Sequence, residues 1–131
     1  MNLTPTGDAY MGGGVRVLPR DFMKLGQLLL NEGVWNGRRV LRAAWARRSA
    51  SPLSEMGGRR YGYLWWLTDY SHENRTVRAF FTCGNGGQIV MVVPELELVA
   101  AFYGGNYSAP GTFLAQQVYV PRYILPAVVG R

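Results

Sequence analysis

The sequence contains very little of the chemistry that disulfides and most metal sites need. Its 131 residues include one cysteine, Cys83, and one histidine, His72. A single cysteine excludes an internal disulfide, and a structural zinc site requires four ligands that come mainly from these two residue types. We therefore expect no metal and no other cofactor. Cysteine usage leaves the cellular compartment open.

Long hydrophobic runs are also missing. The longest apolar segments, such as IVMVV and LVAAFY, are far shorter than the roughly 18 residues that indicate a membrane-spanning helix. No basic segment followed by an apolar one opens the chain. We therefore expect neither a membrane span nor an export signal.

Lysine is nearly absent, whereas arginine is abundant. Thirteen of the fourteen basic residues are arginine, and with eight acidic residues the net charge is +6. A group of arginines in the first half could form either a phosphate-binding stripe or a solvated helix face. This group consists of Arg38, Arg39, Arg42, Arg47 and Arg48. No known nucleic-acid-binding motif accompanies it, so we expect a solvated surface and no nucleic-acid partner.

The composition does provide enough core material for one compact domain. Hydrophobic residues make up 48% of the chain and aromatic residues 13%, and the length is typical of a single domain. We expect an α+β fold in one domain. Residues 1–58 should form a mainly helical segment, and residues 59–131 a small antiparallel sheet with a C-terminal helix packed on it.

Helical signals dominate the first half. Pro19 suits the first turn of a helix, and Phe22, Leu25 and Leu29 recur at helical spacing. Gly33 suits the position just after a helix end. These features predict a helix that begins at Pro19 and ends before Gly33.

A tight turn and a shorter helix should follow. Asn36 and Gly37 lie between two short apolar pieces, which is typical of a hairpin turn. The segment RAAWARRSA then resumes a helical pattern that Pro52 ends.

Strand signals dominate the second half, after a segment that reads as a loop. Aromatic and β-branched residues predict two strands, and a longer apolar stretch predicts an antiparallel hairpin joined at PELE. Pro121 and Pro126 should limit the C-terminal helix. In order, the expected elements are a loop over residues 51–60, a strand over 61–67, a polar hairpin loop over 68–75, a strand over 77–82, the hairpin strands 89–93 and 98–103, and a helix over 111–123.

The segment TCGNGGQIVMVVP places three glycines and an asparagine directly before the strand IVMVV. Glycine is costly to order, so its small size or its freedom must be used here. Either the chain turns tightly into the strand, or something approaches the main chain at an active site.

Three segments taken together resemble one enzyme family. They are GDAYMGGGVRVLPRDFMKLGQLLLNEGVWNGRRVL, YGYLWW and GNGGQIVMVVPELELVAAFYGGNY. In this order they resemble the C-terminal part of serine beta-lactamase-related hydrolases, a group that includes class C beta-lactamases, penicillin-binding D-alanyl-D-alanine carboxypeptidases, esterases and amide hydrolases. Family members are often periplasmic or secreted. The resemblance implies a partial beta-lactamase-like fold and acyl transfer on an amide, ester or lactam.

The resemblance also implies a substrate cleft at the glycine-rich segment. The family's third motif matches Asn85, Gly86 and Gly87, followed by Gln88 at the start of the strand. By analogy, the main-chain N–H of Gln88 would donate to the oxyanion of acyl transfer and Asn85 would face the substrate. No catalytic residue is assigned.

The family's first two motifs have no counterpart in the chain. A Ser-x-x-Lys motif needs a lysine three residues after serine, but Asp21 stands three residues before Lys24. No tyrosine is followed two residues later by asparagine. The chain therefore reads as a single incomplete domain, either a hydrolase portion that is inactive alone, a self-standing binding or interaction module, or a subunit completed by a partner chain.

Other candidate groups have simpler explanations. Asp69, His72 and Cys83 could form a thiol site, but a buried inert thiol is commoner. Glu95 and Glu97 flank a turn and should be solvated. The aromatic residues Tyr61, Tyr63, Trp65 and Trp66 could line a cleft, but core or sheet-face positions are commoner.

The missing part should leave apolar surface uncovered. We expect a homo-oligomer or a partner chain to cover it, with an interface above about 2,000 Å² and strand residues such as Trp65 or Phe80 near its centre. A small amide or ester is the expected type of ligand.

Overall fold

The computed structural model describes residues 3–8, 13–72 and 74–129. Residues 9–12, which belong to the segment GDAYMGGG, lie outside the described part. The described helices and strands are, in order, α1 (Pro19–Leu30), β1 (Val34–Trp35), β2 (Arg38–Arg39), α2 (Ala43–Ser49), β3 (Ser54–Met56), β4 (Arg59–Tyr61), β5 (Trp66–His72), β6 (Arg75–Phe81), β7 (Ile89–Val93), η1 (Pro94–Leu96), β8 (Leu98–Phe102), η2 (Ala115–Ile124) and α3 (Leu125–Val129).

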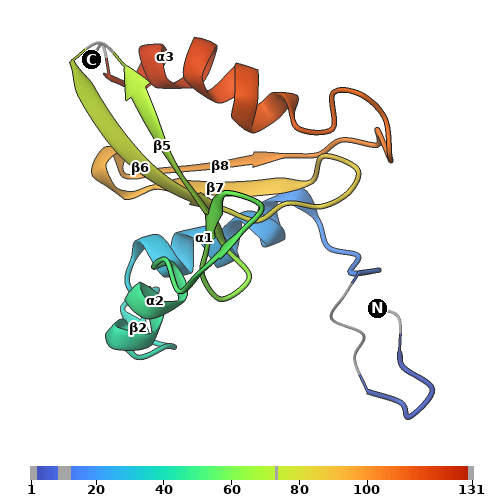
Figure 1. Cartoon of the computed structure of the whole chain (residues 1–131). Coiled ribbons are helices and arrows are strands. Elements are labelled where there is room, and N and C mark those ends of the chain that lie inside the picture. The colour runs from blue at the N-terminus through green and yellow to red at the C-terminus, as the bar shows by residue number, and fades with distance from the viewer. Residues whose placement is uncertain (1–2, 9–12, 73, 130–131) are drawn as a thin grey trace.

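The described residues form a mixed α and β fold of three layers, in which a sheet lies between two helical layers (Figure 1). A six-stranded antiparallel sheet runs in the order β3-β4-β5-β6-β7-β8, so neighbours in the chain are neighbours in the sheet. Helix α1 lies against one face, and η2 with α3 lies against the other (Figure 1). The predicted antiparallel sheet and C-terminal helix are therefore confirmed, although the sheet is larger than expected.

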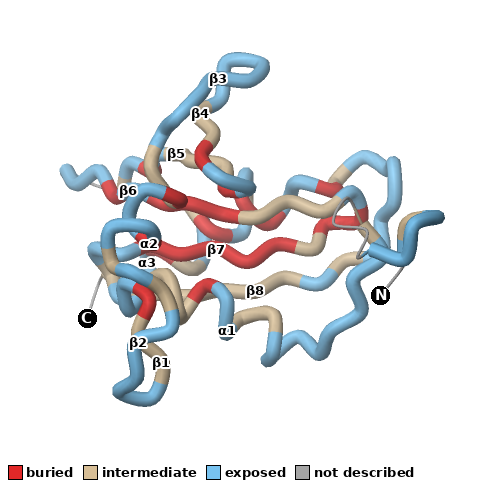
Figure 2. Tube along the Cα trace, turned by 90° about the horizontal axis from the view of Figure 1, so that it is seen from below, coloured by how far each residue is buried: buried red, intermediate tan, exposed pale blue. Residues whose placement is uncertain are grey.

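Strand β7 is buried on both faces, which explains its uninterrupted apolar sequence. Ile89, Met91 and Val93 belong to the core under the C-terminal helix. Val90 and Val92 point the other way, toward α1. Figure 2 shows the buried positions concentrated in β6 and β7, while β3 and the turn of the β3–β4 hairpin are exposed. The predicted hairpin is confirmed, with Ile89 opposite Phe102 and Val93 opposite Leu98.

Helix α1 begins and ends where the sequence predicts, and Leu29 of the predicted apolar stripe packs against the core, whereas Leu25 does not. Pro19 occupies the first turn, and the chain leaves the helix through Asn31. Leu25, expected on the apolar stripe, is 52% exposed. Gly26 is buried instead, because the helix approaches β7 and β8 so closely that a Cβ there would lie 2.8 Å from Val90 Cγ1.

Residues 51–60, predicted to be a loop, contain a β-hairpin. Strands β3 and β4 pair from Ser54–Tyr61 to Met56–Arg59. Gly57 and Gly58 form the turn with φ of +57° and +72°, the conformation of a tight hairpin turn. The Gly-Gly pair was the signal for this hairpin. Each strand has only three residues, SEM in the exposed β3 and RRY in the partly buried β4, and neither sequence shows apolar alternation.

The next strand also begins later than predicted. Residues 61–67 do not form one strand, because the chain turns between β4 and β5 at Leu64, where φ is +63°. The polar segment predicted as a hairpin loop lies largely within β5. In that segment the Tyr70 side chain is buried in the core.

The C-terminal helix runs further than predicted. It begins at Ala115 rather than near 111 and continues through Pro121 to Val129. Residues Ala115–Ile124 have the wide π-helical hydrogen-bond pattern, in which the Leu125 N–H donates to the Val120 carbonyl oxygen. Pro121 has no N–H to donate, so the sequence predicts that a helix ends near it. In the structure the helix instead continues through Pro121 in the wider π-helical form.

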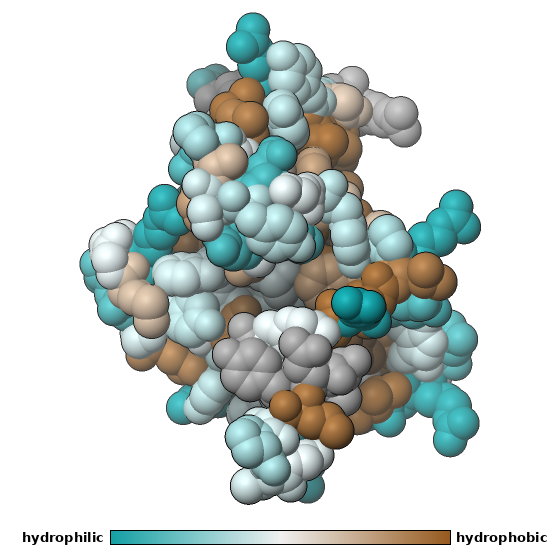
Figure 3. All heavy atoms as spheres, turned by 90° about the vertical axis from the view of Figure 1, so that its right-hand side faces the viewer, coloured by the Kyte–Doolittle hydropathy of each residue, from teal (hydrophilic) through white to brown (hydrophobic). Residues whose placement is uncertain are grey.

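The apolar surface expected at the sheet lies elsewhere. Trp65 and Phe80 are buried in this chain, where they pack with Leu29 and Leu30 of α1, so neither can lie at the centre of an interface. Exposed apolar side chains occur around α2 and along the N-terminal arm. They include Trp45, Tyr63 and Leu64 near α2, and Leu3, Val15, Val17 and Leu18 in the arm. On the face bordered by the arm, hydrophobic and hydrophilic side chains are interspersed (Figure 3).

Candidate functional site

The segment between β6 and β7 folds into a compact, closed loop. The Gly84 N–H donates to the Gln88 carbonyl oxygen at 2.8 Å, and the Gly87 N–H donates to the Gly84 carbonyl oxygen at 3.0 Å. These two bonds close the loop at the point where β7 begins. They fix the main chain of all four residues predicted to form a substrate cleft.

The Gln88 side chain braces this loop from inside the chain. Its Oε1 accepts the Gly86 N–H at 3.1 Å, and its Nε2 donates to the Gly104 carbonyl oxygen at 2.7 Å. The Asn106 N–H then donates to the Gly86 carbonyl oxygen at 3.2 Å. The loop is thus tied to the segment that follows β8. Within the described residues, no acceptor takes the main-chain N–H of Gln88.

Close packing within the chain accounts for Gly86. A Cβ at this position would collide with Gln88 Nε2 and would lie 2.9 Å from Tyr107 Cε1. Gly87 has a φ of +86°, a conformation that side chains other than glycine rarely adopt. Both explanations for the glycines therefore apply: Gly87 allows the tight turn, and Gly86 allows other groups to lie close to the main chain. These groups are the side chains of Gln88 and Tyr107 of the same chain.

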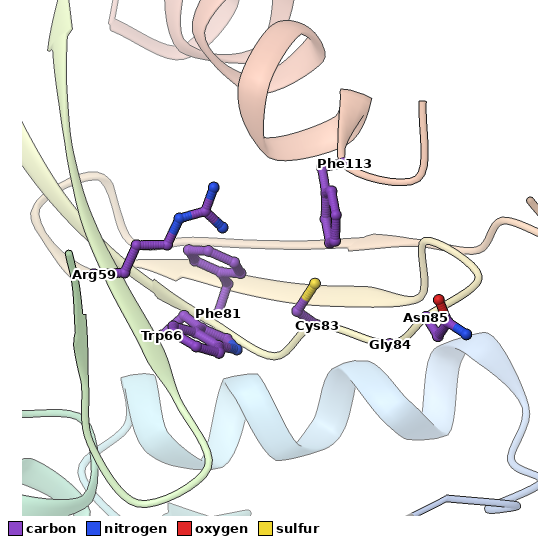
Figure 4. Close-up of a pocket in the computed structure, with 7 residues that line it drawn as sticks. All are labelled: Arg59, Trp66, Phe81, Cys83, Gly84, Asn85 and Phe113. Carbon is purple, nitrogen blue, oxygen red and sulfur yellow. The ribbon is translucent and has the colours of Figure 1, made fainter. Parts of the chain in front are cut away.

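A cavity of about 310 Å³ opens beside the loop, between the sheet and the start of the C-terminal helical region. Its lining residues come from four separate segments of the chain. They are Arg59, Trp66, Phe81, Cys83, Gly84, Asn85 and Phe113 (Figure 4). Asn85 is thus the predicted cleft residue that lines the cavity, whereas Gly86, Gly87 and Gln88 support the loop behind it.

The polar groups of the cavity have distinct environments. Burial raises the pKa of the Cys83 thiol, and the positive charge of Arg59 partly offsets this rise. The thiol therefore stays largely protonated at neutral pH and is a poor nucleophile. Asn85 is exposed, and its carboxamide makes no hydrogen bond with another described residue.

The alternative thiol site is not assembled. Asp69 forms a salt bridge with Arg60, with Nη2 and Oδ2 2.9 Å apart. His72 lies at the far end of the β5–β6 hairpin from the cavity, opposite Arg75. Cys83 has neither residue among its cavity neighbours. The structure therefore separates the three residues of that hypothesis.

The aromatic candidates divide between two layers and the surface. Trp65 is buried toward α1, whereas the adjacent Trp66 lines the cavity on the opposite face. Tyr61 packs on Trp66 with ring centroids 4.6 Å apart, and Tyr63 packs on Trp45 at 5.0 Å. Of the four aromatic residues singled out in the sequence, Trp66 belongs to the cavity.

The charged candidates lie on the surface, as expected. The arginine group of the first half is exposed, and Arg47 of this group forms a salt bridge with Glu32 at 2.7 Å. Glu95 and Glu97 are exposed at the turn between β7 and β8. Sequence reasoning missed Arg59 and Phe113. The sequence features next to them are the pair Gly57-Gly58, which precedes Arg59 and predicts a turn, and the helical spacing of Phe113 with Gln117 and Val118. Neither feature predicts a position in a cavity.

The described residues contain no group of three or more His, Cys, Asp and Glu side chains that could hold a metal ion. Across residues 3–8, 13–72 and 74–129, every helix is too short or too polar to cross a membrane.

Comparison with known protein families and curated proteins finds no relative of the chain. No family model matches the chain, and no curated protein is similar to it.

Proposed function

We propose that this chain forms the substrate-cleft part of a serine hydrolase that acts by acyl transfer on an amide, ester or lactam. The nucleophile and the general base would come from a polypeptide segment that carries a Ser-x-x-Lys motif, which these 131 residues lack. The chain alone would then be inactive. The single observation that carries the proposal is the braced loop of Asn85 to Gln88 beside an open cavity.

The loop has two properties that acyl transfer requires. An oxyanion donor must be held in place before the reaction, so that no energy is spent on orienting it. The Gln88 side chain holds the loop by hydrogen bonds at 3.1 and 2.7 Å, and the Gln88 main-chain N–H has no acceptor among the described residues. Asn85 adds a polar side chain at the cavity wall.

A complementation experiment tests this proposal. The chain alone should hydrolyse nitrocefin and p-nitrophenyl acetate no faster than buffer. Co-expression with a segment that is encoded next to it and carries Ser-x-x-Lys should give turnover. Replacing the serine of that segment should abolish this turnover, and replacing the adjacent lysine should reduce it strongly.

Two variants of the present chain make the experiment specific. Asn85→Ala should lower kcat/KM of the complemented enzyme by about tenfold or more, because it removes a polar group next to the reacting bond. Asn74→Ala, at the exposed far end of the β5–β6 hairpin, should leave it unchanged. Turnover by the chain alone that is lost in Cys83→Ala would refute the proposal.

A second candidate function is a binding module. It is favoured by the lining of the cavity, which combines aromatic rings with the guanidinium group of Arg59 and the carboxamide of Asn85. Such a module would bind its ligand without any complementing segment, so binding and turnover can be tested separately.

A further inference from the structure

The cavity beside the loop has a size that suits a small molecule. Its volume of about 310 Å³ lies at the lower end of the range typical of ligand sites. Its wall combines parts of three strands, the loop between β6 and β7, and Phe113, which lies two residues before the C-terminal helix. An occupant would therefore be held by positions fixed by the sheet.

Three of the seven residues that line the cavity are aromatic. Phe81 and Trp66 belong to strands β6 and β5, and Phe113 points down from the start of the helical region toward the sheet, above Cys83 (Figure 4). Aromatic rings prefer to stack or to meet edge to face. The arrangement therefore favours a flat, unsaturated group between the sheet and Phe113.

Arg59 supplies the charge of the cavity. Its guanidinium group projects over Phe81 toward the helical region (Figure 4). Among the described residues, no acidic side chain lines the cavity and no carboxylate lies within salt-bridge distance of Arg59. By contrast, the neighbouring Arg60 is paired with Asp69. A planar guanidinium without a partner is suited to bind a carboxylate through two parallel hydrogen bonds.

The remaining polar groups agree with an anionic ligand. Asn85 lies at the opposite end of the cavity from Arg59 (Figure 4). Its carboxamide can donate a hydrogen bond. Cys83 lies between them with its sulfur facing the cavity.

We infer that this cavity binds a small aromatic carboxylate, whose ring lies among Trp66, Phe81 and Phe113 and whose carboxylate pairs with Arg59. This binding goes beyond the proposed hydrolase role, because it needs no residue outside the present chain. If the hydrolase proposal is refuted, the binding of an aromatic carboxylate can still hold. If this binding is refuted, the hydrolase proposal can still hold.

Phenylacetate and its uncharged analogue phenylacetamide test the inference on the full chain. Titration calorimetry should give a Kd for phenylacetate of about 1 mM or below and an affinity for phenylacetamide at least about tenfold weaker, since the charge-assisted pairing is lost. Cys83 provides an independent measurement, because it is the single cysteine and lines the cavity. Saturating phenylacetate should slow its alkylation by iodoacetamide at least about threefold, as the ligand covers the sulfur.

Matched variants locate the charge that binds. Arg59→Gln should weaken phenylacetate binding at least about tenfold, and Arg59→Lys should recover part of the loss, since it keeps the charge but not the planar fork. Arg75→Gln is the control, because Arg75 is exposed at the other end of the same sheet. It should bind as the wild type does.

Three results would overturn the inference: equal affinity for the two ligands, equal affinity of Arg59→Gln and Arg75→Gln, or alkylation of Cys83 that phenylacetate does not slow. Circular dichroism should confirm that each variant is folded. If Arg59→Gln does not fold, the comparison of the two ligands on the wild-type chain decides the matter by itself.

Discussion

The close approach of α1 to the sheet can be tested by adding a single methyl group at Gly26. A Cβ at this position would lie 2.8 Å from Val90 Cγ1, 2.9 Å from Val99 Cγ1 and 3.1 Å from Val92 Cγ2. These contacts are shorter than normal van der Waals contact, so the helix would have to move away from β7 and β8. The methyl groups belong to short β-branched side chains, which have little freedom to turn aside.

Two opposing effects set the size of the change in Gly26→Ala. In the interior of a free helix, replacing glycine by alanine stabilises by about 1 kcal/mol. Overpacking of a well-packed core costs about 1 to 3 kcal/mol, and here a single methyl meets three others. The difference between these two effects is a net loss of about 0 to 2 kcal/mol. Because three methyl groups are met at once, we expect the upper half of this range, a loss of about 1 to 2 kcal/mol in the free energy of unfolding and a fall in Tm of about 4 to 8 °C.

Urea unfolding followed by tryptophan fluorescence measures this change. Leu25→Ala, on the exposed side of the same helix, is the control and should change the free energy of unfolding by less than about 0.5 kcal/mol. The double variant Gly26→Ala with Val90→Ala should recover about 1 kcal/mol relative to the sum of the single changes, because it removes the shortest contact. A Gly26→Ala variant more stable than the wild type would refute the close packing of α1.

Four further predictions follow from individual contacts and from the exposed surface. Tyr70→Phe removes the hydrogen bond from the Tyr70 hydroxyl to the Gln116 carbonyl oxygen at 2.8 Å and should cost about 1 kcal/mol at neutral pH. Burial raises the pKa of Tyr70, so the stability that this side chain contributes is fully present below about pH 10 and is lost at higher pH, where the phenol ionises in the unfolded state. The loss of stability at alkaline pH, measured by urea unfolding, should therefore be smaller in Tyr70→Phe than in the wild type. The same dependence of stability on pH in both proteins would contradict this. Both side-chain polar atoms of Gln116 are buried without a partner among the described residues, so Gln116→Leu should raise the free energy of unfolding by about 1 to 3 kcal/mol, and a loss of stability in the same assay would show that the amide has a partner. Arg59→Gln should slow the alkylation of Cys83 near pH 8, because the positive charge that lowers the thiol pKa is removed, whereas Arg75→Gln should leave the rate unchanged. Light scattering at tens of micromolar should detect a dimer or a larger assembly, because large apolar side chains are exposed, and a stable monomer would count against the expected association.

Elements with strong local signals were predictable from the sequence. Pro19 and Gly33 bracket α1, and the apolar run of β7 followed by PELE and LVAAF determines the β7–β8 hairpin. Asn36 and Gly37 form the expected turn between β1 and β2, with φ of +48° and +75°. In each case the information lies within a few consecutive residues, because turn geometry and side-chain periodicity act over that range.

Elements that depend on distant partners were not predictable in the same way. The short strands β3 and β4 extend the sheet from the edge of β5, and their own sequences have no apolar alternation. The C-terminal helix continues through Pro121, where the sequence predicts a limit. These outcomes are decided by pairing and packing with other parts of the chain, which can override local propensity.

The sequence by itself determined the candidate loop, and the tertiary structure decided what surrounds it. The glycines and Asn85 were recognisable as an unusual entry to a strand. Only the fold brings Arg59 and Phe113, far apart in the chain, to the same cavity, and only the fold turns Gln88 back to brace the loop. Adjacent tryptophans, Trp65 and Trp66, serve opposite faces of the sheet for the same reason. A short sequence pattern is enough to predict a turn of the main chain. Which side chains meet in the cavity depends on contacts made by the whole sheet and both helical layers.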